Sequence, residues 1–338
     1  MTALDELLAH HGDRDAGPGL VDLAVNVRPG TPPQWLRRRL AAVDLARYPD
    51  TSAATRALGS RHGRPPAEVL LTSGAAEAFT LIARARRPRH AVVVHPQFTE
   101  PEVALRAAGH DVQRVVLREP FVLDPAAIPE DADLVVIGNP TNPTSVLHPA
   151  ETLRALSRPG RVLVLDEAFA DAVPGEPHSL AGTGDVPGLL VVRSLTKTWG
   201  LAGLRVGYVL GAAGAIADLA AAQPHWAVSS LAAEACLACT EPPALAEAAT
   251  WARGLTADRA HLADLLADLP GVRVVPNAAA PFLLVHTPTR ELWTPLRERG
   301  FAVRRGDTFP GLGTGWIRVA VRDRATSTVF ATTLAGLL

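Results

Sequence analysis

Lysine is nearly absent from this sequence of 338 residues, and Lys197 is the only one. Arginine supplies the rest of the positive charge, so that 33 Lys and Arg side chains face 34 Asp and Glu side chains, for a formal net charge of −1. A nearly neutral chain has no general attraction for nucleic acid or for an anionic membrane surface. We therefore expect neither of them as a partner.

Cysteine is scarce as well. Cys236 and Cys239 are too few for a disulfide framework, and they indicate a reducing, cytoplasmic compartment. Their Cys-x-x-Cys spacing is compatible with metal or redox chemistry, but the sequence has no second pair and no histidine close by. We interpret them as small buried residues of an Ala-rich helix and predict no metal site.

Long apolar runs are also missing. No stretch of 18 or more apolar residues occurs, and the N-terminal residues lack the apolar core of a targeting segment, so we expect no membrane span. Hydrophobic residues still make up 48% of the chain, which is enough for a packed core. The length exceeds the usual limit of about 250–300 residues for one core, which predicts one large and one smaller domain.

Short apolar segments alternate with helical patterns between residues 68 and 210. The expected strands are Val69–Thr72, Ala91–His95, Leu134–Gly138, Arg161–Asp166, Leu189–Ser194 and Val206–Leu210. Continuously apolar strands separated by helices are typical of an α/β fold with a mostly parallel central sheet flanked by helices. After about residue 215, Ala-rich helices and further short strands predict a smaller α+β domain. We expect an N-terminal arm (residues 1–30) packed on the small domain (216–338), and a large domain over residues 31–215.

Polar residues follow several of these strands, at the edge where open α/β sheets bind ligands. Val69–Thr72 is followed by Ser73, Gly74, Ala75 and Ala76, which form either an anion-binding turn at a helix N-terminus or a plain turn with Ser73 as N-cap.

Asp166 ends another buried strand. Its carboxylate needs a partner there, and a protonated ring nitrogen, a helix N-terminus or an arginine would serve equally.

Lys197 stands in the most informative of these loops. Ser194, Thr196 and Lys197 follow a predicted strand, and Arg205 comes eight residues after the lysine. Lysine forms imines with carbonyl compounds, which arginine does not usefully do. Two hydroxyls and a guanidinium group suit a phosphate. Together with the other loops, the pattern meets the demands of pyridoxal 5′-phosphate (PLP), which needs a phosphate anchor, a pyridinium partner and a lysine.

The sequence resembles the class I and II aminotransferases, which are PLP enzymes of fold type I. The motif Ser-x-Thr-Lys-x-x-Gly-Leu-Ala-Gly-Leu-Arg at residues 194–205 carries the resemblance, with Asn-Pro-Thr at 142–144 and Asp-Glu-Ala at 166–168 in the family's order. Within the family the chain is most similar to the branch of histidinol-phosphate aminotransferase and the cobalamin-pathway threonine-phosphate decarboxylase. The likeness extends from about Asn26 to Arg318.

The resemblance implies a set of cofactor contacts. Lys197 resembles the Schiff-base lysine, and Asp166 the residue that keeps the pyridine nitrogen protonated. Asn142 resembles the donor to the phenolic oxygen, and Phe98 the aromatic residue stacked on the ring. The expected phosphate anchor consists of Gly74, Ala75, Ala76, Ser194, Thr196 and Arg205.

The resemblance also implies substrate contacts and a partner. Arg318 resembles the arginine that binds a substrate carboxylate, and Arg304 a second anion-binding arginine of the branch that acts on phosphorylated substrates. Asn26 and Arg28 occupy the place of a substrate-binding Asn-x-Asn-Pro motif. Tyr48 resembles a tyrosine that reaches the phosphate in the neighbouring subunit, which implies a homodimer with shared active sites.

Besides Arg28, which replaces the second Asn of Asn-x-Asn-Pro, two departures from the family pattern leave the reaction open. Ser145 replaces the glycine that usually follows Asn-Pro-Thr, and Phe169 stands where aminotransferases often have a tyrosine. We expect transamination of a small amino acid that carries a second anionic group, with phosphate favoured. Decarboxylation of threonine phosphate is the alternative, since the two reactions differ only in which bond at Cα stands perpendicular to the ring. A non-catalytic carrier is disfavoured by the intact Lys197, Asp166 and Arg205.

Overall fold

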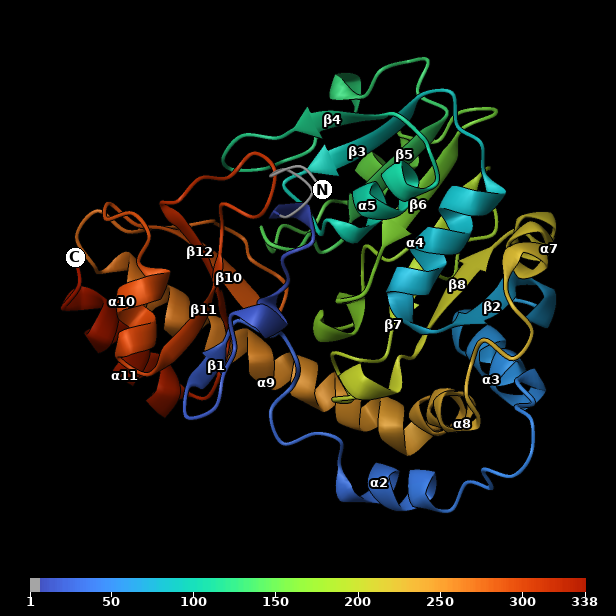
Figure 1. Cartoon of the computed structure of the whole chain (residues 1–338), viewed down its shortest axis with the longest axis horizontal. Helices are drawn as coiled ribbons and strands as arrows, with labels where there is room; N and C mark the ends of the chain where they lie inside the picture. The colour runs from blue at the N-terminus through green and yellow to red at the C-terminus, as the bar shows by residue number, and fades with distance from the viewer. Residues whose placement is uncertain (1–6) are drawn as a thin grey trace.

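The computed structural model describes residues 7–338, so residues 1–6 of the predicted N-terminal arm lie outside the described part. Within that range the strands form two sheets, which Figure 1 shows side by side. The larger sheet has the order β2-β8-β7-β6-β5-β3-β4, and only β8 runs antiparallel to its neighbours. Its strands are β2 (Val69–Thr72), β3 (Ala91–His95), β4 (Val112–Val116), β5 (Leu134–Gly138), β6 (Val162–Asp166), β7 (Leu189–Ser194) and β8 (Gly207–Gly211).

Helices cover both faces of this sheet because alternate residues of each strand are buried on opposite sides. Val164 and Val192 face one helical layer, whereas Leu163, Leu165 and Val191 face the other. The first layer consists of α4 (Gly74–Ala85), α5 (Glu100–Ala107) and α7 (Ala213–Ala222). The second consists of α2 (Gln34–Ala41), α3 (Ser52–His62), α6 (Ala150–Arg154) and α8 (Ser230–Cys239).

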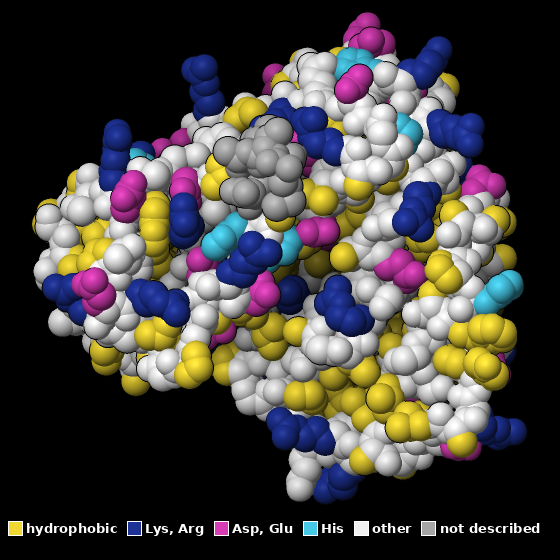
Figure 2. Space-filling view, viewed as in Figure 1, with side chains coloured by type: hydrophobic (Ala, Val, Ile, Leu, Met, Phe, Trp, Pro, Cys, Tyr) yellow, Lys and Arg dark blue, Asp and Glu magenta, His cyan; other side chains and the backbone are white. Residues whose placement is uncertain are grey.

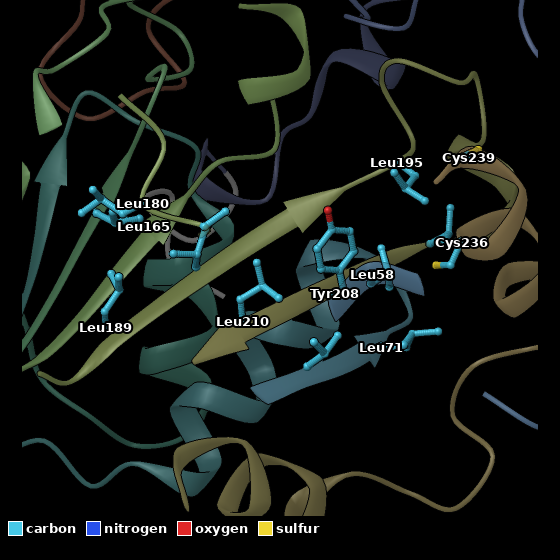
Figure 3. Packing of buried hydrophobic residues seen from close by; sticks show 14 of the residues in the cluster. Leu58, Leu71, Leu165, Leu180, Leu189, Leu195, Tyr208, Leu210, Cys236 and Cys239 are labelled. Carbon is cyan, nitrogen blue, oxygen red and sulfur yellow. The ribbon is translucent and has the colours of Figure 1, made fainter. Parts of the chain in front are cut away.

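Cys236 and Cys239 belong to that second layer. Figure 3 shows both on α8, in the same core as Leu58 of α3 and Tyr208 of β8. Both thiols are free and buried, and burial raises the pKa of Cys236 to about 12. Such thiols stay protonated and unreactive, which confirms the interpretation as packing residues.

The smaller sheet has the order β1-β11-β12-β10-β9, and β1 runs parallel to β11. Its strands are β1 (Val21–Leu23), β9 (Arg273–Val274), β10 (Phe282–His286), β11 (Phe301–Arg305) and β12 (Trp316–Ala320). The helices around it are α9 (Pro242–Ala267), α10 (Trp293–Glu298) and α11 (Arg324–Ala335). In Figure 1, α9 runs obliquely from the small sheet to α8, with α2 below it. Short 3₁₀ turns complete the fold at Gly12–Arg14, Pro66–Glu68, Pro125–Ala127, Ala170–Ala172 and Ala202–Leu204.

The predicted mostly parallel sheet with a smaller α+β part is confirmed, and most expected strands lie within a residue or two of their predicted bounds. The sequence did not reveal β1 and β4. β1 has three residues, and β4 is an edge strand in which Gln113 and Arg114 interrupt the apolar pattern. Since β1 joins the small sheet, residues 21–23 of the arm pack there, while the domain boundaries at residues 30 and 215 stay a prediction. No helix in residues 7–338 is long and apolar enough to cross a membrane.

Candidate active site

The carboxyl ends of β6 and β7, the N-terminus of α4 and the small sheet enclose a cavity of about 500 Å³. Most of the predicted site residues meet here, although they come from segments far apart in the sequence. The lining consists of His11, Gly12, Asp13, Ala24, Val25, Asn26, Ala75, Ala76, Phe98, Glu100, Asn142, Asp166, Ala168, Phe169, Ser194, Thr196, Lys197, Ala202, Arg205, Arg304, Phe309 and Arg318.

Lys197 follows β7 at the bottom of this cavity. Burial, together with the nearby charges of Arg318 and Arg205, lowers the pKa of its amine to about 8. Its backbone is held in place because the Lys197 carbonyl accepts a hydrogen bond from the N–H of Arg28 at 2.9 Å. Far more neutral amine is therefore present near physiological pH than in an exposed lysine, and the neutral amine is the form that attacks a carbonyl carbon.

Asp166 ends β6 and faces the same cavity. Burial raises the pKa of its carboxyl group to about 6, and Lys197 acts against this shift. One carboxylate oxygen accepts a hydrogen bond from the backbone N–H of Ala168 at 3.0 Å, whereas no side chain among residues 7–338 bonds to it. A cationic ring nitrogen would supply the missing partner and keep this carboxylate ionised.

A compact anion site lies at the N-terminus of α4. Gly74 has φ +77°, and a Cβ on it would approach Nη2 of Arg205 to 2.8 Å, so only glycine leaves room for the guanidinium group. Ser73 precedes the helix, but its side chain does not cap it. The first backbone N–H groups of α4 therefore remain available to an anion.

Two hydroxyl groups complete this anion site. Ser194 Oγ and Thr196 Oγ1 lie 2.8 Å apart, and both residues line the cavity together with Arg205. Within the described part of the chain, the guanidinium of Arg205 is bonded only to the carbonyl of Ala202, at 3.2 Å. Hydroxyls, a guanidinium and a helix N-terminus around one point match the needs of a phosphate.

Arg318 of β12 lies across the cavity from Lys197 and is held by several partners. Its Nη1 donates to Oδ1 of Asn142 at 2.5 Å, and its Nη2 donates to the carbonyl of Ala24. With its carbonyl oxygen turned toward the guanidinium, Asn26 accepts from the same Nη1 at 3.1 Å. Burial lowers the pKa of Arg318 to about 9, so the structure places a costly cation at the site.

Arg304 of β11 lies beside Arg318 and binds the N-terminal segment. Its guanidinium donates to Asp15 at 3.3 Å and to the carbonyl of His10, and it stacks on Phe309 at 4.8 Å. His10 and Asp15 of the N-terminal arm thus lie against one of the two predicted substrate arginines.

The sequence did not predict that residues of the N-terminal arm line the cavity. His11, Gly12 and Asp13 line the cavity, and Nε2 of His11 lies 2.6 Å from Glu100 and its ring lies 5.5 Å from that of Phe98. The paired histidines at positions 10 and 11 were the only signal, and nothing in the sequence places them beside the start of α5, which is 89 residues away.

Besides Gly74, which lies against Arg205 outside the lining, two predicted site residues do not reach the cavity. Arg28 forms an ion pair with Glu247 of α9 at 3.0 Å and stacks on Trp251 at 5.6 Å, so the structure does not support it as a substrate contact. Tyr48 lies on the surface, 76% exposed, and stacks on Trp226 with 4.5 Å between ring centroids. It does not line the cavity that holds Lys197.

The residues that remain fit PLP. The Gly74 turn with Ser194, Thr196 and Arg205 suits the phosphate, Asp166 lacks a cationic partner, and the amine of Lys197 has its pKa near neutrality. Phe98 and Asn142 line the space between them, where the ring and its phenolic oxygen would lie.

Comparison with known proteins agrees with this geometry. Residues 18–334 match the family model of aminotransferases of class I and II. A histidinol-phosphate aminotransferase of Mycobacterium bovis is 53% identical over 93% of this chain and 86% of its own length. A threonine-phosphate decarboxylase of Salmonella typhimurium is 32% identical over 90% of this chain and 88% of its own length.

A solved structure shows the same fold. The histidinol-phosphate aminotransferase of Sinorhizobium meliloti, solved in complex with pyridoxal-5′-phosphate, has a TM-score of 0.83 at 22% identity and covers 100% of this chain and 97% of its own. The fold and the cavity define an enzyme of the fold-type I class. The chain belongs to the class I and II aminotransferases.

Proposed function

We propose that the protein is a PLP-dependent aminotransferase whose amino substrate carries a phosphate group, as histidinol phosphate does. One observation carries the proposal: a single cavity brings together the amine of Lys197, with a pKa of about 8, the unpaired Asp166 and the buried guanidinium groups of Arg304 and Arg318. The relative that is 53% identical is a histidinol-phosphate aminotransferase, which favours the same substrate class.

Each residue has a distinct part in this proposal. Bound PLP supplies an electron sink for the bonds at the substrate Cα. Lys197 would hold the cofactor, and its amine would carry a proton to and from the substrate Cα. Asp166 keeps the ring nitrogen protonated, while Arg205, Ser194, Thr196 and the α4 N-terminus hold the phosphate.

The two arginines orient the substrate. Arg318, fixed by Asn142 and Ala24, is the proposed seat of a carboxylate such as that of the amino donor, and Arg304 the seat of the second anion. Asp15 occupies Arg304 at 3.3 Å, so a substrate anion would take the place of this carboxylate. Because a guanidinium binds carboxylate and phosphate in the same planar manner, both anion types fit here.

Decarboxylation of threonine phosphate is the second candidate. Threonine phosphate has both a carboxylate and a phosphate for the two arginines, and the chain is 32% identical to a threonine-phosphate decarboxylase. Phe169 also lines the cavity, at a position where aminotransferases often have the hydroxyl group of a tyrosine.

One experiment separates the two. The PLP-loaded protein is incubated with histidinol phosphate and 2-oxoglutarate, and in parallel with threonine phosphate. We expect glutamate to form in the first mixture, whereas CO₂ release in the second without glutamate in the first would replace the proposed reaction by decarboxylation. If neither glutamate nor CO₂ forms, both candidate reactions are contradicted.

We also propose a homodimer in which Tyr48 completes the phosphate site of the partner. The support is the exposure of the Tyr48–Trp226 stack, since two large aromatic rings rarely remain in water unless they lie in an interface. A cytoplasmic location fits the two free cysteines.

A further inference from the structure

Ser145 has a backbone conformation that favours glycine. Its φ is +63°, in the left-handed region, and the residue is fully buried. A side chain there costs roughly 1 kcal/mol relative to glycine. The serine side chain must therefore make an interaction that offsets this strain.

That interaction is a bond to the small sheet. Oγ of Ser145 accepts a hydrogen bond from the N–H of Ala280 at 2.8 Å, and the Ser145 carbonyl accepts one from the N–H of Ala279, also at 2.8 Å. Ala280 is fully buried, so without the hydroxyl its N–H would lack a partner away from water. Ser145 thus binds two successive N–H groups of the loop that leads into β10.

The same loop is fixed at two further points. Phe282, at the start of β10, packs edge-to-face on Phe169 with 5.0 Å between centroids. Arg259 of α9 donates to the carbonyl of Ala279 at 3.0 Å. The segment from Ala279 to Phe282 is therefore held on the large-sheet side by Ser145 and Phe169, the two residues that depart from the family pattern.

The contact between Ser145 and the Ala280 loop affects where the guanidinium of Arg318 lies. Asn142 lies three residues before Ser145 in one loop, which is closed on itself because Ser145 N–H donates to the Thr141 carbonyl at 2.7 Å. Arg318 lies on β12 opposite Leu284 of β10, and its guanidinium is 5.2 Å from the ring of Phe282. A shift of the Ala280 loop relative to Ser145 would therefore move Arg318 relative to Asn142, to which it is bonded.

We propose that Ser145 is a positioning residue. Its hydroxyl, supported by Phe169 against Phe282, holds the small sheet in the arrangement in which Arg318 meets Asn142, so that the seat for a carboxylate is formed before the substrate binds. That a substrate carboxylate binds to Arg318 rests on the proposed function, whereas the hydrogen bond between Ser145 and the Ala280 loop is independent of any reaction.

Two variants test the proposal. Ser145→Gly removes the hydroxyl and relieves the backbone strain, so this variant is expected to fold, while Ser145→Ala removes the hydroxyl and keeps the strain. Ser157→Ala is the matched control, because it deletes a hydroxyl that donates to the carbonyl of Pro187 at 3.0 Å, outside the cavity lining.

The first measurement is amide hydrogen exchange in the protein without substrate. We expect the protection of the Ala280 amide to fall about tenfold in both Ser145 variants and to remain unchanged in Ser157→Ala. The second measurement is steady-state kinetics with L-glutamate as amino donor. We expect KM to rise about tenfold with kcat within about twofold, because the lost interaction orients the bound carboxylate equally before and during the reaction.

Unchanged protection of Ala280 in both variants would overturn the proposal. Reduced protection with an unchanged KM would do so as well, since Ser145 would then be a structural residue only. If the wild-type protein transaminates nothing, the proposed function fails, yet the exchange measurement still decides whether Ser145 holds the loop.

Discussion

Lys197 and Asp166 have pKa values that burial moves toward neutrality from opposite directions. The pKa of the lysine is lowered to about 8 and that of the aspartate is raised to about 6. Between these two values the carboxylate is ionised while a growing part of the amine is neutral. A pair of groups whose environments shift their pKa values in this way is typical of a catalytic site.

The rate at which the protein without cofactor takes up PLP should follow the titration of Lys197. The neutral amine is the reactive form, so the rate should rise about tenfold per pH unit below pH 8 and level off above it. Stopped-flow absorbance between pH 6 and 10 measures this. N-acetyl-lysine methylamide serves as the control and should still gain rate above pH 9. A protein rate that climbs in parallel with this control would show that burial does not activate the lysine.

Single residues were predictable where the chemistry demands one residue type. Lys197, Asp166 and Asn142 could be inferred because each follows a recognisable strand or motif, and the structure brings them into one cavity. The contacts of Arg28 could not be predicted, since the sequence does not show that Glu247 and Trp251 of α9 lie beside it. His11 and Glu100 were missed for the same reason.

The ends of β6 and β7 carry charges on both faces of the sheet. Asp166 faces the cavity, while the next residue, Glu167, faces the opposite side and pairs with Arg193 at 3.0 Å. Arg193 also binds Glu176 at 2.6 Å and Asp171, and Arg61 of α3 binds Asp171 at 2.6 Å. This buried charge cluster, formed by Arg61, Glu167, Asp171, Glu176 and Arg193, joins α3 to the two strand ends that carry the active-site residues.

Replacing Arg193 by methionine should destabilise the protein strongly. The change would leave the buried Glu167 without its cation and Asp171 with Arg61 alone, at a cost of about 3–5 kcal/mol. Denaturant unfolding of the variant and the wild type measures the difference. Arg154→Met is the control, because its partner Asp185 is exposed, and it should cost about 0–1 kcal/mol. Equal losses in the two variants would mean that the buried charge cluster does not stabilise the strand ends.

The bounds of a strand were easier to predict from the sequence when the strand is more buried. Strands β2, β3, β5 and β7 have continuous apolar sequences because both of their faces are covered, and their bounds were predicted to the residue. The edge strand β4 and the short β1 lack such a pattern. The pairing of β1 with β11 joins residues about 280 positions apart, and local sequence carries no information about such a contact.

At the scale of the whole molecule, one face remains unusually apolar. Figure 2 shows hydrophobic side chains gathered over α8 and between α8 and α2. Leu45, Tyr48 and Trp226 are 72%, 76% and 61% exposed. Exposed apolar groups of this size are typical of an interface between subunits, which supports the proposed homodimer.

Mixing two inactive variants tests whether active sites are shared. Lys197→Ala and Tyr48→Ala should each lose most activity, while a refolded mixture should recover about a quarter of the wild-type rate, because half of the dimers are mixed and each has one intact site. Sedimentation analysis confirms the dimer beforehand. A monomer, or a mixture that recovers nothing, would contradict shared sites.

The central claim is that Lys197 holds PLP covalently, and the single lysine of this chain makes it directly testable. The protein is loaded with PLP, reduced with borohydride and digested, and the modified peptide is identified by mass spectrometry. We predict one pyridoxyl group per chain, on Lys197, and none after prior substitution of Lys197 by alanine. A protein that takes up no pyridoxyl group, or carries it only on its N-terminal amine, would contradict the account.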